Sequence, residues 1–449
     1  MKVKTSYYNF QIERNDGSLL LYNSRTGAIV FVDNVEQIKQ VEDILKEPNK
    51  YIETDILNAL FNNGFIISDN IDEIKIVAQN FIEANMDRTN LNITILPTEF
   101  CNFKCPYCFI IEQGKFFKMN TDTYDSIYKF ILQYIEQNKQ KIILTIGWFG
   151  GEPLLCKSDI KNFMKRLIAL ENKYENLTLR GKMVTNGYLL NYETFIEMYD
   201  FKIRNFQITL DGDEKNHDSW RILKDGAPTF STIYNNLLDI KNQCRESDIS
   251  ISIRGNFLKS NVDSMKKLAR KIIRDFKDDN RFDLSFRPVV DFISKKDEKG
   301  VKDSDYCRNE EAIVIQKELS QVMVGKENTS NRMFSPFPMP INKWCNVCKQ
   351  NSFIIDPKGL VFACDSVLSD KEQSIGKIKL DGSILYNSNI EIWKKNIFHT
   401  DKYVKCKVCK LLPVCLGGCT RQRLLNGEGV CTWTTDMIEN ELLKYSITL

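Results

Sequence analysis

Eleven of the fourteen cysteines fall into two groups whose spacing is typical of iron–sulfur ligands. The first group is a C-x3-C-x2-C loop that consists of Cys101, Cys105 and Cys108. Three thiolates in one tight loop can hold three irons of a [4Fe–4S] cube and leave the fourth iron without a protein ligand. A small molecule can bind at such an iron, as at a three-ligand metal site that keeps one position for substrate.

The second group lies near the C-terminus and contains eight cysteines, which is the number that saturates two further cubes with four ligands each. Its members are Cys345, Cys348, Cys364, Cys406, Cys409, Cys415, Cys419 and Cys431. The pattern predicts one cluster that cleaves a bound molecule and two clusters that support it. A zinc site or disulfides are the alternatives for the first group.

Size and composition describe an ordinary globular chain. It has 449 residues, of which 43% are hydrophobic and 27% charged, enough for two or three domains. The net charge of 62 − 59 = +3 gives no reason to expect nucleic acid or an acidic membrane as a partner. No apolar run approaches the ~18 residues of a membrane span, and the N-terminus lacks the apolar core of a signal peptide. We therefore expect a cytoplasmic protein, in which clustered cysteines bind metal.

Residues 1–90 are predicted to form a separate module. Strand patterns at 10–13, 18–23 and 27–32 precede helical patterns at 35–46 and 53–62, a strand at 65–67 and a helix at 72–86. Strands and helices in this order, with the turn Asn15-Asp16-Gly17, favour a winged-helix-like fold. A plain capping domain is the alternative.

Residues 91–290 alternate strand and helix six times, which predicts a parallel sheet in an α/β fold. Six units rather than eight indicate a partial (β/α)6 barrel of the TIM type, open on one side. The strands are expected at 91–96, 142–146, 177–184, 206–210, 249–254 and 282–288, with helices that include 121–137, 158–172, 229–243 and 262–276. Polar motifs follow nearly every strand, so they should meet at the carboxyl ends of the strands and form one site.

The rest of the chain is predicted to contain a bridge over residues 291–343, with one helix near 309–324, and a cysteine-rich domain over residues 344–449. The proline-rich stretch 335–340 marks the boundary between them.

The Cys101 loop, with Tyr107 before its third cysteine, resembles the signature of radical S-adenosylmethionine (SAM) enzymes. Gly150-Gly151-Glu152-Pro153 after the second predicted strand resembles the motif with which that family binds the methionine amine of SAM. The resemblance implies that SAM chelates the open iron and that an electron from the cluster splits its C–S bond to release a 5′-deoxyadenosyl radical. Adjacent glycines allow close backbone approach, and Glu152 supplies a carboxylate for an ammonium.

The same resemblance implies further SAM contacts. Thr209 and Asp211, at the end of the fourth strand, would face the ribose and methionyl part, and Arg221 would pair with the carboxylate of SAM. The alternative for Thr209 and Asp211 is that they cap a turn. His217 is expected to have a structural role.

The cysteine-rich tail resembles the SPASM domain, which carries auxiliary clusters in peptide-modifying radical SAM enzymes. Two spacings indicate this resemblance: Asp356-Pro357-Lys358-Gly359 between Cys348 and Cys364, and the run from Cys406 to Cys431. By resemblance, one auxiliary cluster would be held by Cys345, Cys348, Cys364 and Cys419, and the other by Cys406, Cys409, Cys415 and Cys431. Whether both Cys345 and Cys348 are ligands stays open.

Asp365 directly follows Cys364, at the place where sulfatase-maturing relatives have an aspartate that takes a proton from the substrate side chain. It is therefore a candidate general base, with an ordinary surface turn as the alternative. Cys156, Cys244 and Cys307 lie outside every motif and are expected to be spare thiols.

The sequence favours a maturase of ribosomally made precursor peptides. The N-terminal module resembles the peptide-recognition element of such enzymes, which implies that it binds the leader of the peptide through an edge strand. The product would carry a thioether or carbon–carbon crosslink. A low-potential electron donor, such as flavodoxin or ferredoxin, would be a second partner. The alternatives are an anaerobic sulfatase-maturing enzyme, which oxidises Cys or Ser to formylglycine, and a non-catalytic iron–sulfur electron carrier.

Overall fold

A computed structural model describes most of the chain, namely residues 2–51, 54–110, 117–290, 301–307, 309–323, 338–395, 397–399, 401–429, 431 and 433–444. The chain divides into two compact units. Unit 1 comprises Met1–Asp87, Arg332–Gln350 and Trp393–Leu449, and unit 2 comprises Arg88–Asn331 and Asn351–Ile392. The domain limits expected at residues 90, 290 and 343 remain predictions. Part of the proline-rich stretch, 335–337, lies outside the described residues.

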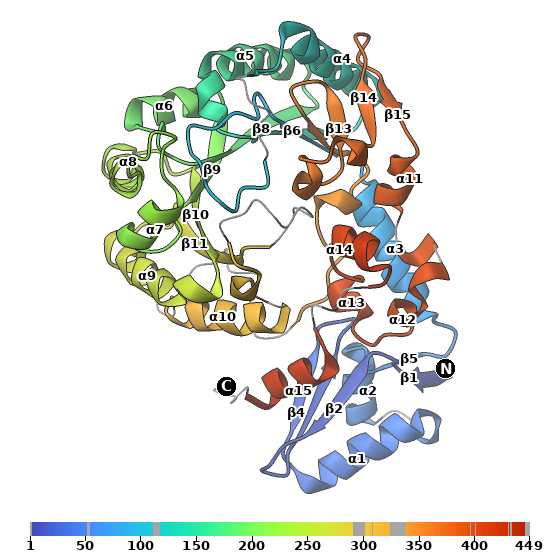
Figure 1. Cartoon of the computed structure of the whole chain (residues 1–449). Coiled ribbons are helices and arrows are strands. Elements are labelled where there is room, and N and C mark those ends of the chain that lie inside the picture. Colours follow the sequence, from blue (N-terminus) through green and yellow to red (C-terminus); the bar gives the residue numbers. More distant parts are fainter. Residues whose placement is uncertain are drawn as a thin grey trace. The chain divides into compact units, whose positions relative to one another are not determined.

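Unit 2 is built on a curved sheet in which six parallel strands follow one another in chain order (Figure 1). These strands are β6 (Asn90–Ile95), β7 (Ile142–Trp148), β8 (Leu177–Thr185), β9 (Ile203–Thr209), β10 (Ser250–Phe257) and β11 (Phe282–Pro288). The sequence predicted all six strands from strand-like runs, and burial alternates residue by residue in β6. The expected parallel sheet is confirmed.

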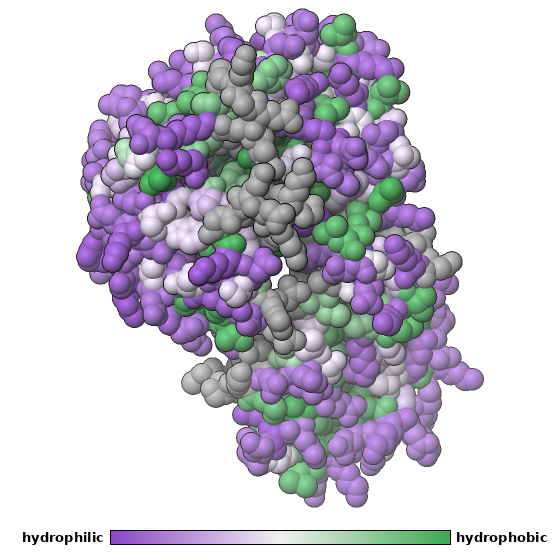
Figure 2. All heavy atoms as spheres, in the orientation of Figure 1, coloured by the Kyte–Doolittle hydropathy of each residue, from purple (hydrophilic) through white to green (hydrophobic). Residues whose placement is uncertain are grey.

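Helices cover one face of this sheet, here called the outer face. They are α4 (Thr121–Gln137), α5 (Lys157–Lys173), α6 (Tyr192–Asp200), α7 (Glu214–Trp220), α8 (Phe230–Gln243), α9 (Val262–Phe276) and α10 (Asn309–Gln321). Apolar strand residues such as Leu91, Ile93 and Ile95 are fully buried, whereas Asn92 and Thr94 alternate with them and face the opposite, inner face. The solvent sides of the helices are mostly hydrophilic (Figure 2).

Four short strands from the cysteine-rich tail extend the same sheet beyond β6, and the sequence analysis did not predict them. They are β12 (Ser352–Ile355), β13 (Leu360–Phe362), β14 (Gly376–Ile378) and β15 (Ile384–Tyr386). β12 runs parallel to β6, and the later pairings are antiparallel. Lys371 lies in this extension and pairs with Asp356 at 3.0 Å and with Glu99, which precedes the Cys101 loop. The extension is thus fixed to the loop by charge as well as by the sheet.

Unit 1 contains a three-stranded antiparallel sheet and helices on both of its faces. The strands are β2 (Asn9–Glu13), β3 (Leu19–Asn23) and β4 (Ile29–Val32), and β1 (Val3–Thr5) pairs with β5 (Ile66–Ser68). The helices are α1 (Val35–Lys46), α2 (Asp55–Asn62), α3 (Glu73–Met86), α12 (Val404–Lys407), α13 (Leu412–Cys415), α14 (Thr420–Asn426) and α15 (Thr435–Lys444). A further helix, α11 (Asn389–Lys394), contains the chain position at which unit 2 passes into unit 1.

Every residue of β3 is buried, because both faces of its sheet are covered. Leu19 and Leu21 pack with apolar residues of α1 and α2. Leu20 and Tyr22 point the other way and pack with residues of α13 and α15. The N-terminal sheet and the C-terminal cysteine-rich segment therefore share a core, which composition and periodicity did not indicate.

The winged-helix-like fold of residues 1–90 remains a prediction, because the order of strands and helices in unit 1 does not establish that fold. Within the described residues, no helix is both long and apolar enough to cross a membrane.

The shared core in unit 1 gives a stability prediction. Ile438 of α15 is fully buried against the β2–β3 face, so Ile438→Ala should lower the free energy of unfolding of unit 1 by about 2–5 kcal/mol. Urea unfolding followed by the fluorescence of the N-terminal tyrosines measures this. Leu443→Ala, on the same helix but 40% exposed, is the control and should change little. Equal effects of the two changes would contradict the shared core.

Candidate active site

The cysteine loop begins just past the carboxyl end of β6, where the parallel sheet offers a position for a site. Thr98 holds its start by donating from Oγ1 to the Phe117 carbonyl at 2.6 Å. Inside the loop, the Phe103 amide donates to Cys101 Sγ at 3.4 Å and the Cys108 amide donates to the Cys105 carbonyl at 3.2 Å. The three predicted cysteines are therefore presented by a single turn-rich segment.

The thiols of this loop share one electrostatic environment. Burial raises the pKa of Cys101 to about 12, and the charges of Glu152, Cys105 and Cys108 add to this shift. Burial also raises the pKa of Cys105 to about 11, although Arg221 opposes it. Buried thiols of this kind ionise when they bind a metal, and a cube takes each thiolate on a separate iron. Within the described part of the chain, no three His, Cys, Asp or Glu side chains are grouped as they would be around a single metal ion.

Gly150 and Gly151 lie directly against the backbone that leads into the loop. A Cβ on Gly150 would lie 2.3 Å from the Thr98 carbonyl oxygen, and one on Gly151 would lie 2.1 Å from that of Phe100. The φ of Gly150 is +123°, which also favours glycine. The sequence analysis expected close backbone approach at these glycines, and the structure identifies what they approach: they let two loop segments pack without side chains between them.

Glu152 is completely buried, and its carboxylate accepts three hydrogen bonds from the protein. Oε1 accepts from the Leu154 amide at 3.0 Å and from Thr185 Oγ1 at 2.8 Å, and Oε2 accepts from the Asn186 amide at 2.8 Å. Asn186 in turn donates to Asn102 beside Cys101 at 2.8 Å. Glu152 thus joins the end of β8 to the cysteine loop. Pro153 follows it at the first position of a 3-10 turn.

Asp211, Tyr107 and Arg221 form a buried cluster. The Tyr107 hydroxyl donates to Asp211 Oδ2 and accepts from Arg221 Nη1 at 2.8 Å. Arg221 Nη1 lies 3.8 Å from Asp211 Oδ2, and Asp211 Oδ1 accepts from the Asn256 amide at 2.8 Å. The structure brings together these three residues, which are far apart in the sequence.

Burial raises the pKa of Asp211, and the guanidinium of Arg221 opposes that shift. For Arg221 itself, burial acts to lower the pKa, but the charges of Tyr107, Cys105 and Asp211 outweigh it and raise the pKa well above the usual value. Arg221 Nε is buried and has no hydrogen-bond partner among the described residues. A buried guanidinium with an unused donor beside the loop fits an anionic group such as the carboxylate of SAM.

Thr209 lies at the last position of β9 on the inner face and is nearly buried. His217 is fully buried, accepts from the Asp211 amide at Nδ1 (3.1 Å) and contacts Thr229 Oγ1 at Nε2 (3.1 Å). Burial lowers its pKa well below 6.5. His217 is therefore a neutral residue that positions the Asp211 backbone.

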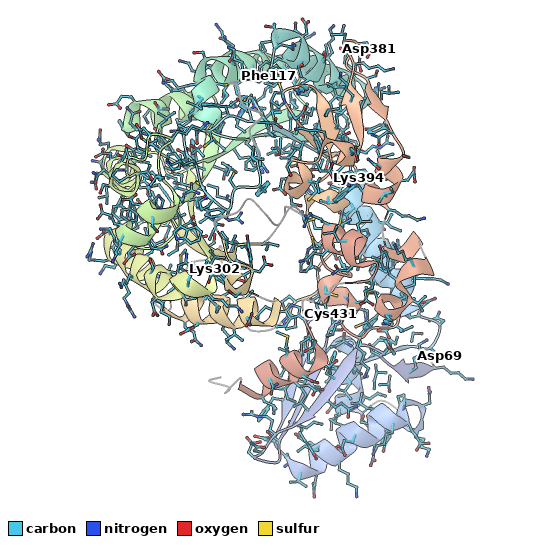
Figure 3. The ribbon with its side chains drawn as sticks, in the orientation of Figure 1. Asp69, Phe117, Lys302, Asp381, Lys394 and Cys431 are labelled. Atoms are coloured by element: carbon cyan, nitrogen blue, oxygen red, sulfur yellow. The ribbon has the colours of Figure 1, made fainter. Side chains whose placement is uncertain are left out.

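One auxiliary cluster is expected to be held by four cysteines that lie in unit 1, namely Cys406, Cys409, Cys415 and Cys431. Burial raises the pKa of Cys415 to about 12, and the charges of Cys409, Cys406 and Cys431 add to that shift. A Cβ on Gly429 would lie 2.4 Å from Cys406 Sγ, so a glycine there leaves room at the sulfur. Cys431 is labelled in Figure 3.

Cys345 and Cys348 also lie close together in unit 1. A hydrogen bond from Cys345 lowers the pKa of Cys348 to about 6, and the charge of Arg423 acts in the same direction. Lys394, labelled in Figure 3, donates to the carbonyls of Val347 and Lys349 at 3.3 and 2.5 Å. Cys419 precedes α14 in unit 1. Cys364 belongs to unit 2, where it lies 3.0 Å from Ser366 Oγ.

Asp365 is exposed in unit 2 and begins a short 3-10 turn after Cys364. Its charge acts on Lys182 of β8 and on Arg254 of β10. Asp365 therefore lies within electrostatic reach of the inner face of the sheet.

Comparisons with known proteins agree with this site. Residues 95–272, which span the cysteine loop and the strands β7–β10, match the Radical SAM superfamily. The chain therefore contains a radical SAM domain, which indicates an enzyme. Such a domain implies a [4Fe–4S] cluster and SAM.

Relatives with assigned activities include sulfatase-maturating enzymes. A cysteine-type anaerobic sulfatase-maturating enzyme of Clostridium novyi is 27% identical over 361 residues, which covers 74% of this chain and 89% of the relative. A serine-type enzyme of Bacteroides thetaiotaomicron is 23% identical, over 72% of this chain and 80% of the relative. A solved structure of native anSMEcpe with bound AdoMet and Kp18Cys peptide has a TM-score of 0.55 at 20% identity, covering 79% of this chain and 95% of that chain, which shows a shared fold.

The sequence analysis missed the basic residues of the inner face, Lys182, Arg254 and Arg287. A signal for them exists in the strand patterns. In β10, Ser250-Ile251-Ser252-Ile253-Arg254 alternates polar and apolar residues, although strands of a parallel sheet covered on both faces are usually apolar throughout.

The hydrogen bonds of Glu152 give a test of its positioning role. Glu152→Gln replaces one carboxylate oxygen with an NH2 group, which cannot accept the hydrogen bonds that the Glu152 carboxylate accepts. The free energy of unfolding should therefore fall by about 1–3 kcal/mol, measured from the shift of the urea midpoint. Glu175→Gln, on an exposed residue, is the control and should leave the midpoint unchanged. If both variants match the wild type, Glu152 does not join β8 to the cysteine loop.

Proposed function

We propose that this enzyme modifies a ribosomally made precursor peptide and installs a thioether or carbon–carbon crosslink. The observation that carries the proposal is the folded N-terminal module of unit 1, which has an edge strand available for a peptide. When bound, the SAM cluster and SAM supply a radical that takes a hydrogen atom from the substrate. The protein's own residues position SAM and the peptide and keep water from the site.

The edge strand is β4, which pairs only with β3 among the described residues. The Asn23 amide donates to the Ala28 carbonyl at 2.9 Å, so Leu21 and Val30 form the next hydrogen-bonded pair. The amides and carbonyls of Ile29 and Phe31 then point to the free edge. Edge-strand addition binds a peptide mainly through its backbone, with little demand on sequence.

The residues of the SAM site have separate roles in this proposal. Cys101, Cys105 and Cys108 would hold the cluster at which SAM binds. Arg221 would use its unpaired Nε for the carboxylate of SAM, and Thr209 and Asp211 would face the ribose and methionyl part. Gly150, Gly151, Glu152 and Pro153 would shape the place of the methionine amine.

The tail is proposed to be a SPASM domain with two auxiliary [4Fe–4S] clusters. One would be held by Cys345, Cys348, Cys364 and Cys419, and the other by Cys406, Cys409, Cys415 and Cys431. The mutual electrostatic influence of the latter four supports the second set. We further propose a cytoplasmic location and a flavodoxin or ferredoxin as the electron donor.

A second candidate function is oxidation of a Cys or Ser side chain to formylglycine. Two observations favour it: relatives that match 74% and 72% of this chain are sulfatase-maturating enzymes, and Asp365 lies beside Cys364, within electrostatic reach of the inner face. In that reaction Asp365 would take the proton from the substrate side chain.

Mass spectrometry distinguishes the two functions. A cysteine-containing precursor peptide encoded beside this gene should lose two hydrogens for each crosslink after anaerobic incubation with the enzyme, SAM and reductant. A sulfatase-motif peptide should stay unmodified. An aldehyde on the sulfatase peptide, with the precursor unchanged, would overturn the crosslinking proposal in favour of the second candidate.

A single edge-strand change tests the role of β4. Ile29→Pro removes an outward N–H while leaving the hydrogen-bonded pairs with β3, so the affinity for the precursor leader should fall by about tenfold. Ile29→Ala keeps the N–H and is the matched control. Fluorescence anisotropy of a labelled leader measures the affinity, and the rate of SAM cleavage without peptide should be equal in both variants. Equal leader affinity in the two variants would exclude β4 as the docking edge.

A further inference from the structure

Three basic side chains lie on the inner face of the unit 2 sheet, away from the helices: Lys182 of β8, Arg254 of β10 and Arg287 of β11. A Cβ on Gly147 of β7 would lie 2.8 Å from Lys182 Cε and 3.0 Å from Thr94 Oγ1 of β6. The side chains of these three neighbouring strands therefore meet on one face. Side chains of the strands extend toward the inside of the curved sheet in Figure 3.

The strand register places the two arginines next to the SAM site. Arg254 lies opposite Thr209 on one side and Ser285 on the other, and Arg287 lies opposite Asn256. Arg254 Nε donates to Asn256 Oδ1 at 2.9 Å, which leaves its terminal nitrogens directed elsewhere. The charges of Asp211 and Tyr107 act on Arg254, so this face and the cysteine loop form one continuous region.

Three cations and the carboxylate of Asp283, two residues before Ser285 on β11, lie on this face. Asp365 is the carboxylate that acts on both Lys182 and Arg254, and Asp211 is already paired with Arg221. The Lys182 ammonium forms no ion pair or hydrogen bond with any residue that the structure describes. Burial lowers the pKa of Lys182, Arg254 and Arg287, because each cation loses hydration. Cations held in this way are a site for an anion.

We propose that Lys182, Arg254 and Arg287 form a subsite that binds a carboxylate of the substrate peptide, close to the residue that reacts. This inference rests on the proposed peptide substrate and names its class: a peptide with an acidic side chain at this position. The carboxylate of SAM is the other source of the same chemistry. Lys182 lies opposite Asn205, four residues before Thr209 along β9, and is thus deeper in the sheet than the SAM site.

The experiment compares two pools of synthetic twelve-residue peptides, capped at both ends, with a fixed central Glu or a fixed central Gln. Equilibrium dialysis against the full-length, cluster-loaded enzyme with SAM measures binding. The Glu pool should bind at least about tenfold more tightly than the Gln pool. Lys182→Met should remove this preference and Lys182→Arg should retain it. Lys165→Met, an exposed residue of α5, is the control.

The KM for SAM in cleavage without peptide separates the two sources of carboxylate. It should change by less than about twofold in Lys182→Met. A large rise in this KM with no preference between the pools would assign the cations to SAM and overturn the inference. Equal binding of both pools to the wild type would overturn the inference alone, whereas binding of neither pool would overturn the proposed peptide substrate as well. Thermal melting of each variant checks that it is folded.

Discussion

The buried carboxylate of Asp211 is the point at which the parts of the active site are joined. It accepts from Tyr107 of the cysteine loop and from the Asn256 amide of β10, and it pairs with Arg221 after α7. A buried carboxylate is stable only when such partners compensate for its lost hydration. The positions of the loop, of two strand ends and of Arg221 therefore depend on one another. His217 adds to this by holding the Asp211 amide from the other side.

A second constraint operates inside unit 1. The β3 strand is buried on both faces, so the sheet with the free β4 edge is completed by α13 and α15 of the cysteine-rich segment. Removal of residues 1–85 would expose the apolar faces of those helices, which adjoin Cys409 and Cys415. Peptide binding and the integrity of that cysteine-rich segment are thus physically linked, and point substitutions separate them better than truncation does.

Much of this architecture could be predicted from the sequence. The six parallel strands and the cysteine loop could be predicted because strand-like runs and the spacing of cysteines are local features of the sequence. The strands β12–β15 could not be predicted, since they have three or four residues each and only β12 pairs directly with the parallel sheet, at β6. The partners that Gly150 and Gly151 approach could not be predicted either, because they are carbonyls about fifty residues away in the sequence. The alternation of polar and apolar residues in β10 is a local signal for cations on the inner face. That the three cations share this face follows only from the register of the strands.

The central claim is that SAM binds at an iron that the three-cysteine loop leaves open. The most direct test is the EPR spectrum of the reduced, reconstituted enzyme recorded with and without SAM. SAM should change the signal of the wild type, and Cys105→Ala should lose that SAM-sensitive signal together with about four irons per chain. An unchanged iron content and an unchanged response to SAM in Cys105→Ala would contradict the account.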